Sequence, residues 1–143
     1  MFDEIIKNAL QEDLGDGDHS SLACIPADAS GIAKLLVKDT GILAGVEVAK
    51  KVCELVDPNL VFEELLSDGT AVKPGDIAFY VKGSARSILA AERTLLNFMQ
   101  RMSGIATQTK SYVDLLEGTQ TRLLDTRKTT PGVRYMEKWA VRI

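Results

Sequence analysis

The sequence "SARSILAAERTLLNFMQRMSGIATQTKSYVDLLEG", which spans residues 84–118, decides the fold. Its apolar residues recur at helical spacing, as the following positions illustrate: Ile88, Leu95, Met99, Met102 and Ala106. This spacing is typical of an amphipathic helix, so we predict one long helix from Ser84 to about Gly118. Gly104 is a candidate for an interruption, because glycine is a poor helix former.

The segments before this helix alternate between helical and strand patterns. Helical spacing predicts helices over 3–14 and 46–56, the second one ending at Asp57-Pro58. The glycines and acids of "GDGDHSS" (15–21) break the first helix. Strand patterns and turn pairs predict three β segments, which cover residues 31–45, 60–66 and 67–83.

After the long helix the pattern changes to strand and then helix. "TRLLDT" (121–126) predicts a short strand, and "PGVRYMEKWAVRI" (131–143) predicts a helix with Pro131 in its first turn. Helix, strand and helix in this order are typical of the start of a βα-repeat array. Because one strand cannot form a parallel sheet, we expect the sequence to be a piece of a longer protein. The predicted fold class is α+β.

Composition excludes several classes of protein. The chain has 143 residues, of which 45% are apolar and 26% charged, as in ordinary globular domains. No run approaches the roughly 18 consecutive apolar residues of a membrane span, and the acidic N-terminus does not resemble a signal peptide. Cys24 and Cys53 lie far apart and there is a single histidine, which argues against zinc and favours two free thiols.

The charge is distributed unevenly along the chain. Residues 1–121 hold 11 Lys or Arg against 18 Asp or Glu, whereas residues 122–143 hold six against two. A basic segment on an acidic body indicates either a nucleic-acid arm or a local site for a small anion. The segment lacks the dense cationic run and interleaved aromatics of a nucleic-acid surface, so a small anion fits better.

The residues after the predicted strand are the first candidates for such a site. Thr126, Arg127 and Lys128 would lie at the carboxyl end of a strand, which is where α/β proteins bind ligands. Arg127 offers a planar fork for a carboxylate or phosphate, and Lys128 offers a compact ammonium group. Consecutive strand residues point to opposite faces, so the two cations converge only if the strand has ended. The alternative is a solvated loop.

The long helix carries a second candidate. Arg93, Asn97, Gln100 and Gly104 share a stripe opposite its apolar face. An arginine in such a stripe is more often solvated than bound to a ligand. The stripe could also be a helix–helix or subunit contact.

Two weaker patterns have structural explanations that we favour. Asp13, Asp16, Asp18 and His19 suggest a metal site, but their spacing differs from that of an EF-hand and is more typical of a capped turn. The β-type segment 67–83 suggests a biotinyl or lipoyl carrier, but neither Lys73 nor Lys82 has the hydrophobic flanks of a modified lysine.

Five motifs together resemble the quinolinate phosphoribosyltransferase family, in order and over essentially the whole chain. They are "EDLGDGD" (12–18), "GILAGVEVAKKV" (41–52), "VKPGD" (72–76), "AERTLLNFMQRMSGIATQT" (91–109) and "LLDTRKTTPGVRYMEKWAV" (123–141). The fourth and fifth are highly specific as a pair. The resemblance implies an N-terminal open-faced α/β sandwich over residues 1–102 and, over 103–143, the first elements of an incomplete α/β barrel.

The resemblance also implies the chemistry. Family members transfer phosphoribose from phosphoribosyl pyrophosphate to quinolinate with loss of carbon dioxide, giving nicotinate mononucleotide for de novo NAD biosynthesis. Mg²⁺ would accompany the pyrophosphate substrate, with ligands outside this chain. Thr126, Arg127 and Lys128 match substrate-contacting positions, and Arg93 matches an arginine that one subunit of a homodimer lends to the other. The general acid or base remains unassigned.

The resemblance further implies a cytoplasmic homodimer or higher homo-oligomer that binds neither nucleic acid nor membrane. The family's later glycine-rich, Asn-His-Arg, lysine and acidic motifs lie beyond this sequence, so the chain is expected to lack part of the active site. Two alternatives stay open: a molybdenum-utilisation paralogue of the same superfamily, and a non-catalytic binding or dimerisation domain.

Overall fold

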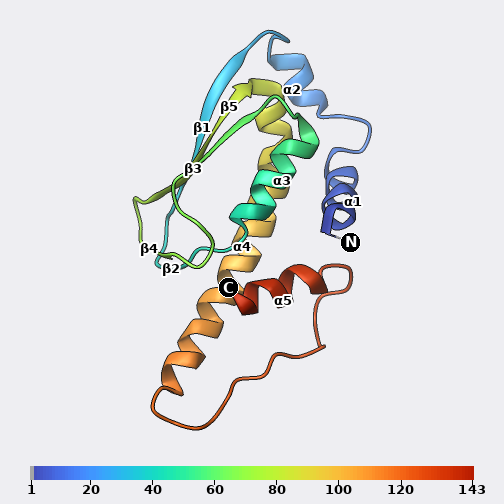
Figure 1. The fold of residues 1–143 in the computed structure, drawn as a ribbon. Helices are drawn as coiled ribbons and strands as arrows, with labels where there is room; N and C mark the ends of the chain where they lie inside the picture. The colour runs from blue at the N-terminus through green and yellow to red at the C-terminus, as the bar shows by residue number, and fades with distance from the viewer. Residues whose placement is uncertain (1) are drawn as a thin grey trace.

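The computed structural model describes residues 2–143 as a mixed chain of helices and strands, which confirms the predicted α+β class (Figure 1). The helices are α1 (Phe2–Leu14), α2 (His19–Cys24), α3 (Val46–Val56), α4 (Ala85–Leu115) and α5 (Arg134–Arg142). The strands are β1 (Ser30–Leu36), β2 (Gly41–Ile42), β3 (Val61–Glu64), β4 (Ala71–Val72) and β5 (Ile77–Ser84).

The main sheet is antiparallel and has one open face. Its strand order is β1-β5-β3, and β2 and β4 form a separate two-stranded ribbon. Ile32 of β1 and Val61 of β3 both pair with Lys82 of the central strand β5. Ile32 and Val61 are 68% and 60% exposed, so this face of the sheet is uncovered. The predicted open-faced sandwich is therefore present.

Helices α3 and α4 cover the other face of the sheet, where the core lies (Figure 1). The apolar side of α3 is fully buried at Val48, Ala49 and Val52. Gly45 caps the start of α3 with a left-handed φ of 98°, and a Cβ there would lie 3.2 Å from the Cα of Met99. Only glycine combines this φ with so close an approach of α3 to α4.

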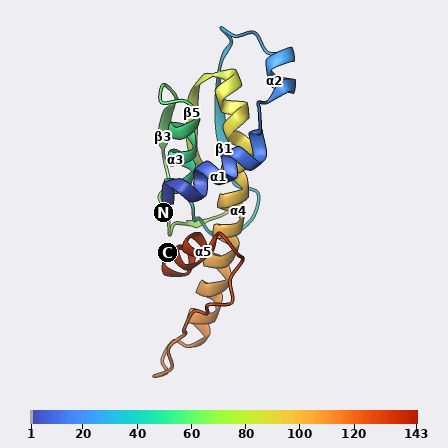
Figure 2. The ribbon, with the colours of Figure 1, turned by 90° about the vertical axis from the view of Figure 1, so that its right-hand side faces the viewer.

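Helix α4 is the longest element, with 31 residues, and it extends well beyond the sheet (Figure 2). It is continuous through Gly104, so the expected interruption was wrong. Its start is capped by the Ser84 hydroxyl, which accepts a hydrogen bond from the Ser87 N–H. Buried side chains on one side, among them Met99, Met102 and Ala106, outweigh the modest cost of one glycine.

Hydroxyl groups of α4 attach the segment around β2 to the helix. Thr107 Oγ1 accepts a hydrogen bond of 2.9 Å from the Ile42 N–H. Ser103 Oγ accepts one of 2.9 Å from the Ala44 N–H and donates to the Ala44 carbonyl. Because β2 pairs with only two residues of β4, these side-chain bonds satisfy backbone groups that the short ribbon leaves free.

The C-terminal third of the chain departs from two predictions. Residues 121–126 form no strand, because a strand needs a neighbour to accept its hydrogen bonds, and no segment within 2–143 pairs with them. Helix α5 begins at Arg134 with Val133 as its cap, so Pro131 lies in the preceding turn and not in the first helical turn. The predicted boundary after residue 102 falls inside α4 and stays a prediction.

Alanine substitution of Gly41, beside α4, and of the exposed Gly104, within α4, is expected to change the free energy of unfolding in opposite directions. Gly41→Ala places a Cβ 2.5 Å from Thr107 Oγ1, whose side chain cannot move without losing its bond to Ile42. We expect this substitution to lower the free energy of unfolding by about 1–3 kcal/mol.

The matched control is Gly104→Ala, at a helical position where a Cβ would meet nothing within 4 Å. We expect it to raise the free energy of unfolding by roughly 0.5–1 kcal/mol, because alanine loses less conformational entropy in a helix. Urea unfolding followed by circular dichroism measures both changes. Equal effects of the two substitutions would contradict the packing described for β2.

Candidate functional site

Thr126, Arg127 and Lys128, here called the corner, lie in the long loop that joins α4 to α5. All three residues are exposed. The Lys128 N–H donates to Thr126 Oγ1 at 3.1 Å and the Thr129 N–H donates to the Arg127 carbonyl at 3.0 Å, which turns the chain tightly. Since the corner is a turn and not a strand, alternation does not force the two cations apart.

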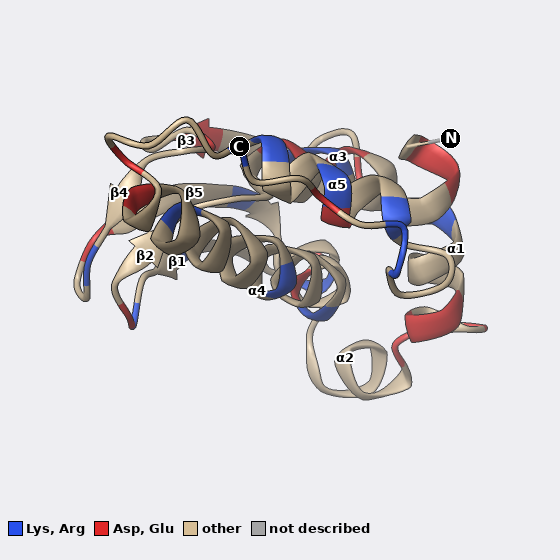
Figure 3. Cartoon of the chain, turned by 90° about the horizontal axis from the view of Figure 1, so that it is seen from below, with Lys and Arg blue, Asp and Glu red and all other residues tan. Residues whose placement is uncertain are grey.

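The corner belongs to the basic end of the chain (Figure 3). Cationic residues lie on α5 and in the loop that precedes it, and one of them, Lys138, forms an ion pair of 2.5 Å with Asp125. Arg127 and Lys128 form no ion pair with another described residue. Their two charges therefore face solvent and remain available to an anion.

Helix α5 holds the loop from one side. Arg134 Nε donates to Thr129 Oγ1 at 2.9 Å, and its Nη2 donates to the Arg127 carbonyl at 3.2 Å. One guanidinium therefore bridges two residues of the turn, which is a geometry that lysine cannot reproduce.

Helix α4 holds the loop from the other side through Arg101. Its Nη2 donates to Thr130 Oγ1 at 2.6 Å and also to Glu137 Oε1, and its Nε donates to the same Glu137 oxygen at 2.7 Å. The second oxygen of Glu137 accepts a bond of 3.1 Å from the Thr130 N–H. The residues Arg101, Thr130 and Glu137 form a closed network, because each one contacts the other two.

Glu137 is a buried charge, with only 8% of its surface exposed. Burial raises the pKa of its carboxyl, but hydrogen bonds from Arg101 and Thr130 outweigh burial and leave the pKa below its ordinary value. Glu137 is therefore ionised at neutral pH, and its charge is neutralised by Arg101.

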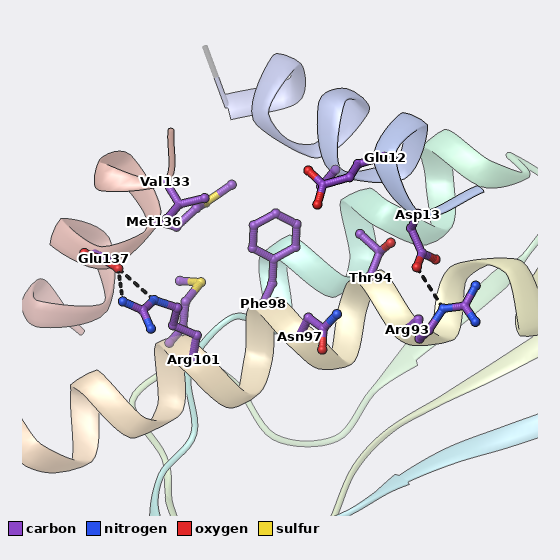
Figure 4. A pocket seen from close by; sticks show the side chains of 12 residues that line it. Glu12, Asp13, Arg93, Thr94, Asn97, Phe98, Arg101, Val133, Met136 and Glu137 are labelled. Atoms are coloured by element: carbon purple, nitrogen blue, oxygen red, sulfur yellow. Dashed lines mark hydrogen bonds and ion pairs between the residues drawn. The ribbon is translucent and has the colours of Figure 1, made fainter. Parts of the chain in front are cut away.

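A pocket of about 650 Å³ opens between α1, α4 and α5 (Figure 4). Its lining residues are Ala9, Glu12, Asp13, Arg93, Thr94, Asn97, Phe98, Arg101, Met102, Val133, Met136 and Glu137. Three of these side chains are carboxylic acids and two are arginines. None of the corner residues lines the pocket, so it is not by itself the cationic anion site that the sequence predicts.

Arg93 lies at the edge of this pocket and is paired with an acid. Its Nε donates to Asp13 Oδ1 at 2.8 Å, as Figure 4 shows. This hydrogen bond and the charge of Asp13 raise the pKa of Arg93. The side chain of Arg93 is 67% exposed. The second oxygen of Asp13 and the hydroxyl of Thr94 are buried without a partner.

The polar stripe predicted on α4 is divided between two surfaces. Arg93 and Asn97 line the pocket, whereas Gln100 and Gly104 line a separate groove beside β1 and β2. The structure of one chain therefore places Arg93 and the corner in different local environments.

The predicted capped turn after α1 is confirmed. Asp18 caps α2, with its carboxylate accepting from the Ser21 N–H, and His19 forms an exposed contact of 3.0 Å with Asp16. Within residues 2–143, no group of three or more His, Cys, Asp or Glu side chains could hold a metal ion.

The remaining candidates are the two cysteines and the lysines of the β segment. Cys24 and Cys53 are free, and burial raises the pKa of Cys53 to about 11, which makes its thiol unreactive at neutral pH. Lys82 forms an ion pair of 2.5 Å with Glu63 on the open face of the sheet.

Sequence reasoning missed three residues that organise the site: Arg101, Arg134 and Glu137. A signal for two of them existed. Arg101 follows Arg93 by eight residues on the same helix, which turns it by about 80° around the axis and keeps it within one broad side of the helix. Glu137 lies between buried Met136 and Ala140, and a carboxylate in such a stripe requires a cationic partner.

Comparison with known proteins gives one consistent result. The N-terminal domain of the quinolinate phosphoribosyl transferase family matches residues 18–103, and its C-terminal domain matches residues 105–143. A curated relative from Oryza sativa, the chloroplastic nicotinate-nucleotide pyrophosphorylase [carboxylating], is 48% identical over 97% of this chain and 37% of its own length. A probable enzyme of the same name from Synechocystis is 37% identical over the whole chain and 48% of its own length.

Solved structures agree. The crystal structure of NadC from Streptococcus pyogenes matches with a TM-score of 0.93 and 39% identity, over 98% of this chain and 51% of that one. The chain thus spans less than half the length of these curated relatives and about half of the solved one. Both domain matches and the shared fold lead to one conclusion: the chain belongs to the quinolinate phosphoribosyltransferase family.

Proposed function

We propose that this chain contributes to a quinolinate phosphoribosyltransferase, which transfers phosphoribose from phosphoribosyl pyrophosphate to quinolinate and releases pyrophosphate and carbon dioxide. Family membership supports the proposal, and so do the names of the curated relatives. The observation that carries it is the corner, where two adjacent cations face solvent without a protein counter-ion among the described residues.

Quinolinate requires such a corner because it is a pyridine with two adjacent carboxylates. In the proposal Arg127 holds a carboxylate with its planar fork, Lys128 neutralises charge, and the Thr126 hydroxyl helps to shape the turn. None of them acts as a general base. Their role is to orient the pyridine nitrogen toward the ribose.

The chemistry follows from that orientation. Pyrophosphate leaves C1 of the ribose with the bonding electrons, and the pyridine nitrogen forms the new bond to that carbon. The resulting pyridinium accepts the electron pair when the carboxylate beside the nitrogen leaves as carbon dioxide, and a proton takes its place. Positive charge that develops on the ribose in the transition state is stabilised by nearby anionic groups.

Arg93 is proposed to act in the site of a second subunit. Its side chain is 67% exposed and pairs with Asp13 through Nε, which suits a group whose terminal nitrogens reach a neighbouring copy. A homodimer with one Arg93 in each partner's site accounts for its distance from the corner along one chain. This arrangement requires that the part of α4 around Arg93 faces a second copy of the chain.

Mg²⁺ is proposed to arrive with the pyrophosphate substrate. The residues described here offer no set of metal ligands, so no step of the reaction is assigned to a metal held by this chain. None of the helices that the structure describes has the length and hydrophobicity of a membrane span. The plant relatives carry chloroplastic or mitochondrial names, so the cytoplasmic location stays a prediction.

The first test of the proposal is quinolinate binding by a family-length protein, meaning one that carries these 143 residues followed by a complete barrel. We expect Arg127→Ala to weaken binding by about 1.5–3 kcal/mol, the contribution of a hydrogen bond to a charged group. Isothermal titration calorimetry measures it. Arg122→Ala removes a cation from the same exposed loop and serves as the control, with little expected change; equal losses would indicate only general charge attraction.

The second test asks whether the subunits share a site. In the family-length protein we expect Arg93→Ala and Arg127→Ala each to lose most activity. Mixing and reassociating the two variants should restore activity to roughly a quarter of the parent's, because hybrid dimers contain one site with both arginines intact. If the mixture stays as inactive as its components, Arg93 does not act across the dimer.

A further inference from the structure

We propose that Arg101, Glu137 and Arg134 are positioning residues, which hold the corner between helices α4 and α5 so that Arg127 and Lys128 face one substrate. The inference rests on the proposed function for the identity of that substrate, quinolinate. The claim that these residues restrain the loop depends only on contacts within this chain.

The first reason is that, apart from the Asp125–Lys138 ion pair, the loop has few other constraints. Residues 121–128 are all exposed, and none of them pairs with a strand in the described chain. A loop of this kind would sample many conformations, and binding a ligand would require ordering it. The hydrogen bonds from Arg101 and Arg134 order the loop before a ligand binds.

The second reason is the arrangement of the bonds around Thr130. Its hydroxyl accepts from Arg101 on α4, and its N–H donates to Glu137 on α5. Both the side chain and the backbone of one residue are therefore fixed, from two different helices. Glu137 is buried, so its bonds compete little with water.

The third reason is that these charged groups are already committed. Arg101 directs Nε and Nη2 to Glu137 and Thr130, and both oxygens of Glu137 accept bonds. Arg134 likewise directs two nitrogens to Thr129 and the Arg127 carbonyl. These side chains use their hydrogen bonds to fix the loop. Arg127 and Lys128 are therefore the cations that contact the substrate.

The last step concerns direction. Arg134 Nη2 donates to the carbonyl of Arg127, so it fixes the orientation of the peptide bond that joins Arg127 to Lys128. Two cations on adjacent residues point to one ligand only if that peptide has a defined orientation. Fixing it before binding lowers the entropic cost of binding the diacid.

Hydrogen exchange in the 143-residue chain tests the holding of the loop. We expect Glu137→Gln and Thr130→Val each to accelerate exchange of the residue 130 amide by roughly tenfold, with faster exchange also at Lys128 and Thr129. Thr130→Ser keeps the hydroxyl and should behave as the parent. Thr121→Val makes the same change outside the network and serves as the control. The inference is overturned if residues 128–130 exchange equally fast in Thr130→Val and in the parent. The substitution lies in the loop, so it leaves the helices unchanged.

Steady-state kinetics of the family-length protein test whether the network positions Arg127 and Lys128 for quinolinate. We expect Thr130→Val to raise the KM for quinolinate by roughly tenfold while kcat and the KM for phosphoribosyl pyrophosphate change less than about twofold, and Thr130→Ser to restore the parent value. A general loss of structure would instead lower the active fraction and so reduce kcat without this selective change.

The two experiments separate the two claims. Faster exchange with an unchanged KM for quinolinate overturns the positioning role and leaves the proposed function standing. A parent protein that neither binds nor turns over quinolinate removes the proposed function and the substrate role together, while the exchange data still decide whether the network holds the loop. Faster exchange together with a selective rise in KM supports the inference.

Discussion

The packing of the other elements on one long helix is the constraint on which this structure depends. Helix α4 contacts all four other helices and strands β1, β2 and β5. Its apolar side forms much of the core, and its hydroxyls fix the segment around β2. The same helix carries Arg93 and Arg101, so the positions of both arginines follow from the packing that makes the fold.

Helix α4 carries two arginines that pair with acids of two different helices. One side of α4 faces the acidic α1, where Asp13 pairs with Arg93, and further along it faces α5, where Glu137 pairs with Arg101. Helix α4 joins Arg93 to the α5 side, and Phe2 of α1 also packs against Tyr135 and Trp139 of α5. A shared site in a dimer is one arrangement that brings Arg93 and the corner to the same ligand.

Much of the fold could be predicted from local patterns. The bounds predicted for α3, residues 46–56, are those observed, because its apolar spacing and the Asp57-Pro58 stop act within the segment. The short α2 was missed, since six residues with no buried side chain give no periodic signal. The strand at 121–126 failed for the opposite reason: its composition favours a strand, but pairing depends on a partner far away in sequence.

Some residues of the candidate site could likewise be found from local motifs, whereas others depend on tertiary contacts. Arg93, Arg127 and Lys128 were proposed from motifs, and their roles stay predictions. The network around Thr130 joins residues 36 and 29 positions apart in the sequence, and no local pattern places Arg101 beside Glu137. Its geometry emerges only when α5 folds back across α4, as Figure 2 illustrates.

The two ion pairs of α4 differ in a way that bears on which arginine can bind a ligand. The Arg93 side chain is 67% exposed and makes a single hydrogen bond to Asp13, so solvent strongly screens this pair. Arg101 makes two hydrogen bonds to Glu137, whose side chain is only 10% exposed. Breaking the Arg101–Glu137 pair leaves a poorly hydrated carboxylate without its counter-ion, although the cost stays below that of a fully buried pair because the Arg101 side chain is 54% exposed. A substrate carboxylate can therefore compete with Asp13 for Arg93, whereas Arg101 remains with Glu137.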